Sequence, residues 1–410
     1  MRARVRVTAP SRAPAGTAAV VGGSIGGLTA ALLLRDAGWD VDVFERSATV
    51  LEGRGGGIVL HPATIRYLVE RAGATPAEMG VPVRWLRYLD AAGRVAHRSR
   101  CDYRFTSYDT IYRRLLAAWG GSRYHLGEEC VGLRDPDSRP SVELSSGRVA
   151  AADVVVFADG INSFGRGLLA PGAEPLYAGY VAWRGTLDDG GVDPAAFEAL
   201  ADAITYQVLP DGHVITYPIP GPAGDAGPGR LRNWLWYWNL APGAELDELL
   251  TAADGTRLAT SVPRGQVPPD RVEDFVRRAR ASLARELAEI LGETPDPFIQ
   301  VILDVAVERM AWGRVCLIGD AAFTARPHIA SGTAKAAENA WTLSAALAGA
   351  GDDVPGALAE WSRGQTALGT DAVARSRDAG TRLQDGTWPL GEPLPYGLYR
   401  VGDGTFPRAS

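Results

Sequence analysis

The sequence predicts an α/β fold in which a doubly wound parallel sheet is assembled from separate stretches of the chain, with an antiparallel sheet and C-terminal helices added to it. Three observations support this prediction. A short apolar strand, a glycine-rich turn and a helix follow one another within residues 18–38. Two more apolar strands, at 154–157 and 315–318, are followed by Asp-Gly and Gly-Asp pairs. Aromatic and β-branched segments bounded by glycine and proline fill much of 180–240, as expected for antiparallel strands.

Length and composition limit the classes of protein that fit. At about 150 residues per domain, a chain of 410 residues is expected to form two or three units. The net charge of −6 is spread over both signs without a basic stripe, so no nucleic-acid partner is expected. No apolar run approaches the roughly 20 residues that span a bilayer, and no membrane partner is expected. Cys101, Cys130 and Cys316 are odd in number and widely spaced, which predicts no disulfide framework and no metal site and suits the cytoplasm.

The elements follow in order from these patterns. Residues 1–17 are arginine-rich without an apolar core and are predicted to be a disordered tail rather than a secretory signal. The first strand covers 18–21, its helix runs from 28 to a stop at 37–38, and a second strand over 41–44 ends at Glu45. The remaining predictions are a glycine-rich loop at 51–60, helices at 64–71 and 108–119, strands at 141–144, 148–150, 154–157, 180–187, 204–209, 213–219 and 233–240, one amphipathic helix at 272–291, a strand at 315–318, and helices at 333–347 and from 352 to about 381.

The turn after the first strand has the features of a dinucleotide site. Gly22 and Gly27 occupy the first and third positions of the glycine fingerprint, and Ser24, a small residue, stands at the second. Amide groups of the turn at Ile25 and Gly26 and of the start of the following helix would hold a diphosphate. Glu45 would accept hydrogen bonds from ribose hydroxyls, and Arg46 follows it.

Two further segments carry a resemblance to a known family. The first is 158–166, Ala-Asp-Gly-Ile-Asn-Ser-Phe-Gly-Arg, and the second combines 319–322, Gly-Asp-Ala-Ala, with Pro327 and 332–334, Gly-Thr-Ala. With the glycine turn, they occur in the order and spacing typical of the class A flavin aromatic hydroxylases, over roughly 18–347. The stretches 54–60, 180–185 and 325–336 are most similar to the dihydroxypyridine hydroxylases of that family. Three departures from its pattern are Phe323 for a histidine, Ala334 for an asparagine and Tyr108 for an arginine.

The resemblance implies noncovalent FAD, with NADPH or NADH as a transient co-substrate. Asp320 would contact the ribityl chain, and the amides of 332–334 would face the pyrimidine edge of the flavin. The residues expected to bind the cofactor are Gly22, Ser24, Ile25, Gly26, Gly27, Glu45, Arg46, Gly56, Gly57, Val131, Asp159, Asp320, Gly332, Thr333 and Ala334. Lys335, the only lysine of the chain, is interpreted as a loop charge or a charge near the phosphates rather than as a catalyst.

Three residues are the candidates for catalysis. His213 and Tyr217 lie four apart on one predicted strand, so their side chains share a face. Related hydroxylases place a His and a Tyr at this spacing in the substrate pocket, although a packed sheet face is the alternative. Arg184 could pair with a phenolate or carboxylate, or it could form a structural salt bridge. His61 and His328 are reserve candidates.

The resulting hypothesis is an α/β protein with a discontinuous doubly wound FAD-binding domain (18–82, 104–178 and 300–350), an antiparallel-sheet substrate domain (83–103 and 179–299) and a C-terminal helical region and tail (351–410). The resemblance implies an NAD(P)H-dependent monooxygenase that hydroxylates an electron-rich aromatic ring, of the dihydroxypyridine or polyhydroxybenzoate type, with O₂ through a C4a-hydroperoxyflavin. The alternatives are another flavin oxidoreductase, such as an oxidase or dehydrogenase, and a non-catalytic flavin-binding redox sensor. A homodimer is compatible with the sequence.

Overall fold

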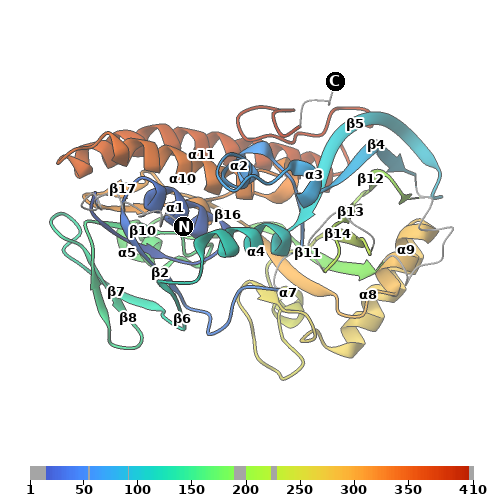
Figure 1. Cartoon of the computed structure of the whole chain (residues 1–410). Coiled ribbons are helices and arrows are strands. Elements are labelled where there is room, and N and C mark those ends of the chain that lie inside the picture. Colours follow the sequence, from blue (N-terminus) through green and yellow to red (C-terminus); the bar gives the residue numbers. More distant parts are fainter. Residues whose placement is uncertain (1–14, 54–55, 91, 189–199, 223–228, 406–410) are drawn as a thin grey trace, which may run out of the picture.

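The computed structural model describes residues 15–53, 56–90, 92–188, 200–222 and 229–405 (Figure 1). Its strands form a six-stranded sheet, a ten-stranded sheet and a small three-stranded sheet. The predicted α/β class is confirmed, because one sheet is parallel with helices packed on it and the other is almost wholly antiparallel. Among the described helices, none is long and apolar enough to cross a lipid bilayer.

The six-stranded sheet is the doubly wound one. Its order is β17 (Ala311–Trp312), β18 (Val315–Leu317), β10 (Val154–Phe157), β1 (Thr17–Val21), β2 (Asp40–Glu45) and β6 (Tyr124–Leu126). All neighbours are parallel except β17 and β18. The chain leaves β1 toward β2 and β6, then returns to β10 on the other side of β1. Ligands of such sheets bind outside the carboxyl ends of the strands where the direction reverses, which here is between β1 and β10.

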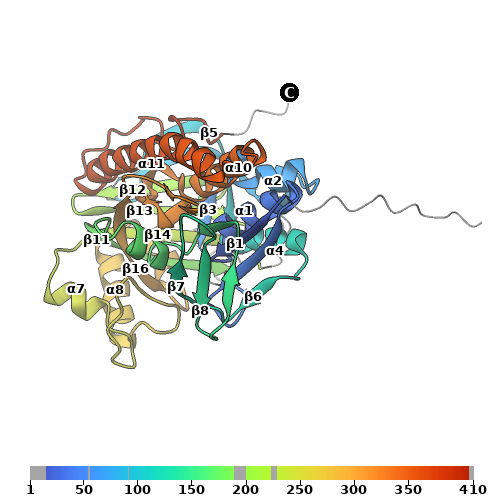
Figure 2. The ribbon, with the colours of Figure 1, turned by 90° about the vertical axis from the view of Figure 1, so that its left-hand side faces the viewer.

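Both faces of this sheet are covered, which is why its central strands β1, β10 and β18 are apolar runs. On one side lie α1 (Ile25–Asp36), α4 (Tyr108–Trp119) and α10 (Gly332–Ala348), of which α1 packs against the other two. Figure 2 shows α10 above the sheet and the three-stranded sheet below it. That small sheet consists of β7 (Cys130–Arg134), β8 (Ser141–Leu144) and β9 (Val149–Ala151).

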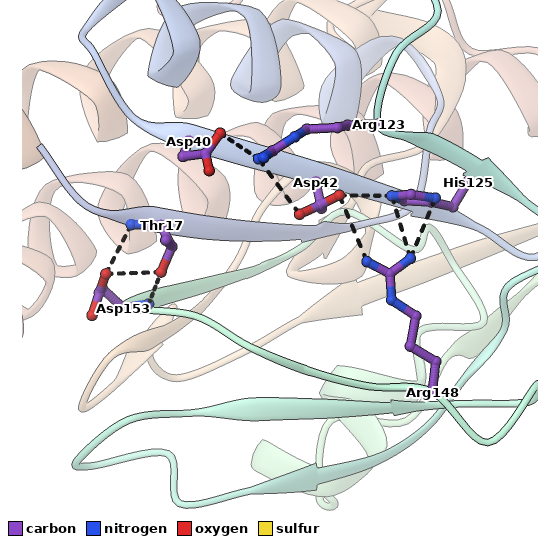
Figure 3. A network of polar contacts seen from close by, with 7 residues as sticks. All are labelled: Thr17, Asp40, Asp42, Arg123, His125, Arg148 and Asp153. Atoms are coloured by element: carbon purple, nitrogen blue, oxygen red, sulfur yellow. Dashed lines mark hydrogen bonds and ion pairs between the residues drawn. The ribbon is translucent and has the colours of Figure 1, made fainter. Parts of the chain in front are cut away.

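A polar network ties the amino-terminal ends of the parallel strands together (Figure 3). The hydroxyl and amide of Thr17, which begins β1, both donate to the Asp153 carboxylate at 2.8 Å. A ring nitrogen of His125 lies 2.6 Å from Asp42 Oδ1, which links β6 to β2. The other members of the network are Asp40, Arg123 and Arg148. It therefore supports the edge of the sheet opposite to the reversal point, and that leaves the carboxyl edge for a ligand.

The ten-stranded sheet contains the aromatic segments. Its order is β15 (Ser261–Val262), β16 (Phe298–Ala306), β11 (Leu176–Asp188), β14 (Leu231–Asn239), β13 (Gly212–Ile219), β12 (Ala203–Leu209), β4 (Val81–Leu89), β5 (Val95–Ser107) and β3 (Gly57–Val59), with β19 (Phe323–Thr324) beside β16. Its pairs are antiparallel apart from β4 and β12. One face buries tryptophans such as Trp183, Trp234 and Trp236 against α8 (Pro269–Ser282) and α9 (Arg285–Gly292). The other face meets α11 (Val354–Gln384).

The remaining helices of the described ranges are short. They are α2 (Pro62–Glu70), α3 (Pro76–Met79), α5 (Phe164–Leu169), α7 (Ala244–Leu249), and the 3₁₀ turns η2 (Gly319–Ala321) and η3 (Pro327–Ile329). The predicted helix 108–119 is confirmed at both ends as α4.

The prediction of one helix over 272–291 is wrong. The chain leaves the helical conformation at Leu283, which is extended at φ −105° and ψ 158°, and a second helix begins at Arg285. The Ala284 amide donates to Oε1 of Gln207 at 2.8 Å, so a side chain of the sheet accepts a hydrogen bond that a continuous helix would have kept. The amphipathic pattern continues across the break because both helices pack on the same face of the sheet.

The division of the chain into units stays a prediction. Of the predicted tail, residues 1–14 lie outside the described residues, whereas Thr17 begins β1. The strands β3 and β16 come from segments assigned to the FAD-binding unit, and they pair within the ten-stranded sheet. The two large sheets therefore share strands from interleaved parts of the chain.

Candidate active site

The turn after β1 requires glycine at two positions. Gly22 has φ +101°, a conformation that side chains rarely allow, and a Cβ there would collide with the carbonyl of Ala158 at the end of β10. A Cβ on Gly27 would collide with the carbonyl of Gly22. The first glycine therefore brings the turns after β1 and β10 together, and the last brings α1 close to its own turn.

The amino terminus of α1 is open toward a cavity. Ser24 precedes the helix without capping it, because its hydroxyl shares a 2.8 Å hydrogen bond with the Tyr108 hydroxyl. Ser24, Ile25 and Gly26 all line the cavity. The first amides of a helix have no partner within it, so this terminus is suited to an anion such as a phosphate.

Glu45 lies beneath this turn at the end of β2. Its side chain is 7% exposed, and its two oxygens accept hydrogen bonds from the amides of Gly23 at 2.8 Å and Ser47 at 2.9 Å. Arg46 and Val131, also expected at the cofactor, are exposed and do not line the cavity.

Two other turns face the same opening. Asp159 Oδ2, after β10, accepts a hydrogen bond from the Gly165 amide at 3.2 Å. Its Oδ1 has no partner among the described residues, and burial raises the pKa of this carboxyl. Arg166, in the same segment, donates to the carbonyls of Ile161 and Ala321. A buried guanidinium thus connects the turn after β10 to η2.

The third turn presents Asp320 at the mouth of the site. Its side chain is about half exposed, and Lys335 Nζ lies 3.6 Å from its Oδ1. Asn339 Oδ1 accepts the Gly319 amide at 3.0 Å, which anchors η2 on α10. At the start of α10, Gly332 and Thr333 line the cavity, the position of a Cβ on Gly332 is open space, and Ala334 is fully buried.

One cavity of about 430 Å³ connects these turns to the ten-stranded sheet. The sheet contributes alternate residues of three adjacent strands, as expected for side chains that share a face. These are Ala182 and Arg184 of β11, His213, Ile215 and Tyr217 of β13, and Leu235 and Tyr237 of β14. The structure therefore brings His213, Tyr217 and Arg184 to one wall.

The three catalytic candidates have different partners. His213 Nδ1 lies 2.8 Å from Gln384 Oε1 of α11, and burial lowers the pKa of this histidine to about 3. The Tyr217 hydroxyl donates to the Gly57 carbonyl at 2.9 Å, and burial raises its pKa. Arg184 Nη1 donates to Gln300 at 2.8 Å. Tyr217 thus anchors the glycine loop, whereas His213 is a neutral group inside the cavity.

The glycine loop fits closely between these side chains. The Gly57 amide donates to Asn233 Oδ1 at 2.7 Å, and a Cβ on Gly56 would lie 2.8 Å from Arg184 Nη2. Gly53, Gly56 and Gly57 are the described glycines of the 51–60 loop, and Gly55 lies outside the described residues. The loop therefore closes the cavity on the side of Arg184.

Known proteins share this architecture. Residues 177–304 match the family model described as FAD binding domain-like, and residues 20–54 match the NAD(P)-binding Rossmann-like domain. The 2,6-dihydroxypyridine 3-monooxygenase of Paenarthrobacter nicotinovorans is 42% identical over 94% of this chain and 96% of its own. The chain belongs to the FAD-dependent aromatic hydroxylases. It is a flavoprotein monooxygenase that uses NAD(P)H, as the resemblance in its sequence implied.

Solved structures of other proteins agree with the fold. The 2,6-dihydroxypyridine-3-hydroxylase from Arthrobacter nicotinovorans superposes with a TM-score of 0.90 at 41% identity, over 95% of this chain and 98% of that one. Klebsiella pneumoniae HpxO complexed with FAD and uric acid has a TM-score of 0.74 at 23% identity, over 90% and 88% of the two chains, and shares the fold.

The residues of this hydroxylase fit FAD. The glycines at 22 and 27 allow the close backbone approach that a diphosphate needs, and the amino termini of α1 and α10 both open on the cavity. Asp159 offers an unpaired carboxylate oxygen beneath the opening, and Asp320 an exposed one at its mouth. The cavity then continues past Gly57 to the aromatic sheet, where a substrate would lie.

Sequence reasoning missed part of this hydroxylase's pocket. Tyr237 lies opposite His213 in the antiparallel register, so the alternation of β14 could have identified it. Tyr206 shares a 2.7 Å hydrogen bond with Tyr396, which comes from the C-terminal segment and has no local signal. His328, a reserve candidate, lines the cavity. His61 does not; it is buried against Gly404, and burial lowers its pKa to about 4.

Proposed function

We propose that this hydroxylase adds a hydroxyl group to a ring of the dihydroxypyridine type, with polyhydroxybenzoates as the related class. The observation that carries the proposal is the continuous cavity, which leads from the dinucleotide turns to a wall of histidine, tyrosine and arginine. The 42% identity to a 2,6-dihydroxypyridine 3-monooxygenase supports the pyridine ring. When bound, FAD would supply the redox chemistry between NAD(P)H and O₂.

The protein residues then bind and orient the substrate. A neutral His213 inside the cavity can accept a hydrogen bond from a ring hydroxyl, because its pKa of about 3 leaves it uncharged near pH 7. Arg184 is half-buried beside Gly56, and its positive charge would stabilise an oxyanion on the substrate ring. Tyr217 positions the loop that separates the two ends of the cavity.

The cofactor would be held at the other end of the cavity, mainly by the turns at the carboxyl edge of the six-stranded sheet. We assign Gly22, Ser24, Ile25, Gly26, Gly27 and Glu45 to the adenine dinucleotide half. Asp159, Asp320, Gly56, Gly57 and residues 332–334 would hold the flavin half. Arg46 and Val131 would make peripheral contacts from the exposed surface. The three free cysteine thiols support a cytoplasmic location. The proposal also includes a homodimer.

The coupling of NAD(P)H oxidation to product formation tests this function. The purified FAD-loaded protein is given 2,6-dihydroxypyridine, 6-hydroxynicotinate or 2,4-dihydroxybenzoate, and the ratio of hydroxylated product to NAD(P)H consumed is measured. A ratio near one with the dihydroxypyridine is expected. Hydrogen peroxide as the sole oxygen product from all three compounds would assign the chain to the oxidases instead.

A further inference from the structure

Two buried histidines from distant parts of the chain stand side by side in the cavity wall. His213 of β13 and His328 of η3 are 1% and 5% exposed, and their ring centroids are 5.2 Å apart. The ring of Tyr237 contacts both, at 4.7 Å and 5.1 Å between centroids. Both histidines line the cavity, so the hydrogen atoms that they carry determine what the wall can bind.

A chain of three hydrogen bonds sets the tautomer of His213. Asn239 Nδ2 donates to the Gln384 carbonyl at 3.2 Å, which leaves Asn239 Oδ1 to accept from Gln384 Nε2 at 2.8 Å. Gln384 Oε1 must then accept, so His213 Nδ1, 2.8 Å away, carries the hydrogen. A neutral imidazole has one hydrogen. Nε2 of His213 therefore keeps its lone pair.

Tyr180 sets the tautomer of His328. Its hydroxyl lies 2.7 Å from Nε2 of His328, which is its one hydrogen-bond acceptor within the described part of the chain. Arg326, which also faces this hydroxyl, can only donate. Burial raises the pKa of Tyr180, so the phenol keeps its proton and donates it to Nε2. His328, neutral because burial lowers its pKa, then carries its hydrogen on Nδ1.

The orientation of His328 agrees with this assignment. A Cβ on Gly380 of α11 would lie 2.8 Å from Cδ2 of His328 and 3.0 Å from the Tyr180 hydroxyl. The ring edge formed by Cδ2 and Nε2 thus faces α11 and β11. The opposite edge, with Nδ1, is left for the cavity.

We infer that the two histidines offer opposite hydrogen-bonding groups to the substrate, a lone pair on His213 Nε2 and an N–H on His328 Nδ1. The site would thereby recognise an aromatic ring through two oxygen atoms in a 1,3 relationship. One is a hydroxyl that donates to His213, and the other is an oxo or oxyanion oxygen that accepts from His328. Gln384, Asn239 and Tyr180 are the positioning residues. The inference rests on the proposed function and names the substrate feature that the wall selects.

Rings with a single oxygen satisfy only one of these groups. The other buried nitrogen is then left without a partner, and such a loss weakens binding by roughly tenfold or more. A 1,3-dioxygenated heterocycle such as 2,6-dihydroxypyridine satisfies both. 2-Hydroxypyridine differs from it by one oxygen and is the matched probe.

Nitrogen-15 NMR of the histidine rings in the FAD-loaded protein tests the tautomers directly. The chain has five histidines, so single substitutions assign the signals of His213 and His328. Both are expected to show a protonated Nδ1 and an unprotonated Nε2. A protonated Nε2 on either ring would overturn the inference while leaving the hydroxylase assignment intact. Tyr180→Phe should convert His328 to a mixture of tautomers, and Gln384→Met should do the same for His213, whereas Gln384→Glu should preserve the Nδ1–H form.

Binding to the oxidised holoenzyme tests recognition. Flavin absorbance is titrated with 2,6-dihydroxypyridine and with 2-hydroxypyridine, and at least tenfold tighter binding of the former is expected. Tyr180→Phe should reduce that ratio several-fold, with FAD affinity unchanged. The control is Tyr177→Phe on the same strand, which loses a hydrogen bond to the Leu240 carbonyl away from the cavity lining and should keep the wild-type ratio. Equal binding of both pyridines would overturn the inference, and binding of neither would contradict the proposed function as well.

Discussion

The ammonium group of Lys335 lies 3.6 Å from Oδ1 of Asp320, with the lysine side chain 1% exposed and the aspartate side chain 49% exposed. The single lysine of the chain is thus buried in the first turn of α10, directly beneath a carboxylate that we assign to the flavin half of the cofactor. Its Nζ has no hydrogen-bond partner within the described structure. Asp320 is the carboxylate that raises the pKa of Lys335 and so partly offsets the effect of burial.

Lys335→Met should change how stability depends on pH. Burial lowers the pKa of Lys335, so below the unfolded-state value of about 10.5 the unfolded chain binds this proton more readily than the folded one. The free energy of unfolding of the wild type, measured relative to Lys335→Met, should therefore rise with pH as the pH approaches about 10.5, by at most about 1.4 kcal/mol per pH unit. Urea denaturation at several pH values measures the difference. A difference that does not vary with pH would show that Lys335 titrates alike in both states.

Asp320→Asn should weaken FAD binding about tenfold or more, because a charge-assisted hydrogen bond contributes about 1.5–3 kcal/mol. The change in flavin fluorescence on binding gives the dissociation constant. Asp352→Asn, an exposed position between α10 and α11, is the control that should bind FAD normally. Because Asp320→Asn also leaves Lys335 unpaired, the double variant with Lys335→Met separates the two effects. The double variant should regain wild-type stability and still bind FAD weakly. If it also regained wild-type FAD affinity, Asp320 would act only as a structural partner of Lys335.

Two glycines of α11 form a matched pair for testing the substrate wall. A Cβ on Gly380 would press on His328 and Tyr180, whereas a Cβ on Gly364 meets open space. Gly364→Ala should stabilise the protein by about 0.5–1 kcal/mol, because alanine favours a helix over glycine. Gly380→Ala should raise the dissociation constant for the aromatic substrate several-fold and leave FAD binding unchanged. If both variants bound substrate like the wild type, the pair formed by His328 and Tyr180 would have no part in recognition.

Arg184→Lys should lower the rate of hydroxylation by roughly tenfold to a hundredfold with FAD still bound. Lysine keeps the charge but loses the planar fork that reaches Gln300, and losing a charged hydrogen bond costs about 1.5–3 kcal/mol. Single-turnover kinetics of the variant measures the effect. Arg278→Lys, in an exposed ion pair with Asp211, should behave like the wild type. Equal rates for all three proteins would remove Arg184 from the substrate site.

The parts of the fold that the sequence predicted are those with local signals. Burial requires the apolar runs at 154–157 and 315–318, and a positive φ requires the glycine at position 22. Each of these features can therefore be recognised from its own residues. The hairpin of β4 and β5 was not predicted, because β5 alternates exposed and half-buried residues over much of its length and lacks such a run. The break at Leu283 depends on Gln207, which lies 76 positions earlier in the chain, so no local pattern could show it.

The candidate site divides in the same way. His213, Tyr217 and Arg184 were found because alternation along a strand and a family resemblance both indicated them, and they do line one cavity. The partners that define their roles come from elsewhere: Gln384 from α11, Gly57 from the glycine loop and Gln300 from β16. Hydrogen bonds between distant segments leave no periodicity in a sequence. The sequence could therefore identify residues of the cavity wall. It could not show which of their groups donate and which accept hydrogen bonds.

The fate of molecular oxygen tests the central claim most directly. The FAD-loaded protein is incubated with NAD(P)H, 2,6-dihydroxypyridine and ¹⁸O₂, and the aromatic product is analysed by mass spectrometry. A monooxygenase transfers one atom of O₂ to the ring, so we expect a trihydroxypyridine that carries one ¹⁸O atom. A product without ¹⁸O, or unchanged substrate together with ¹⁸O-labelled hydrogen peroxide, would contradict hydroxylation of this ring.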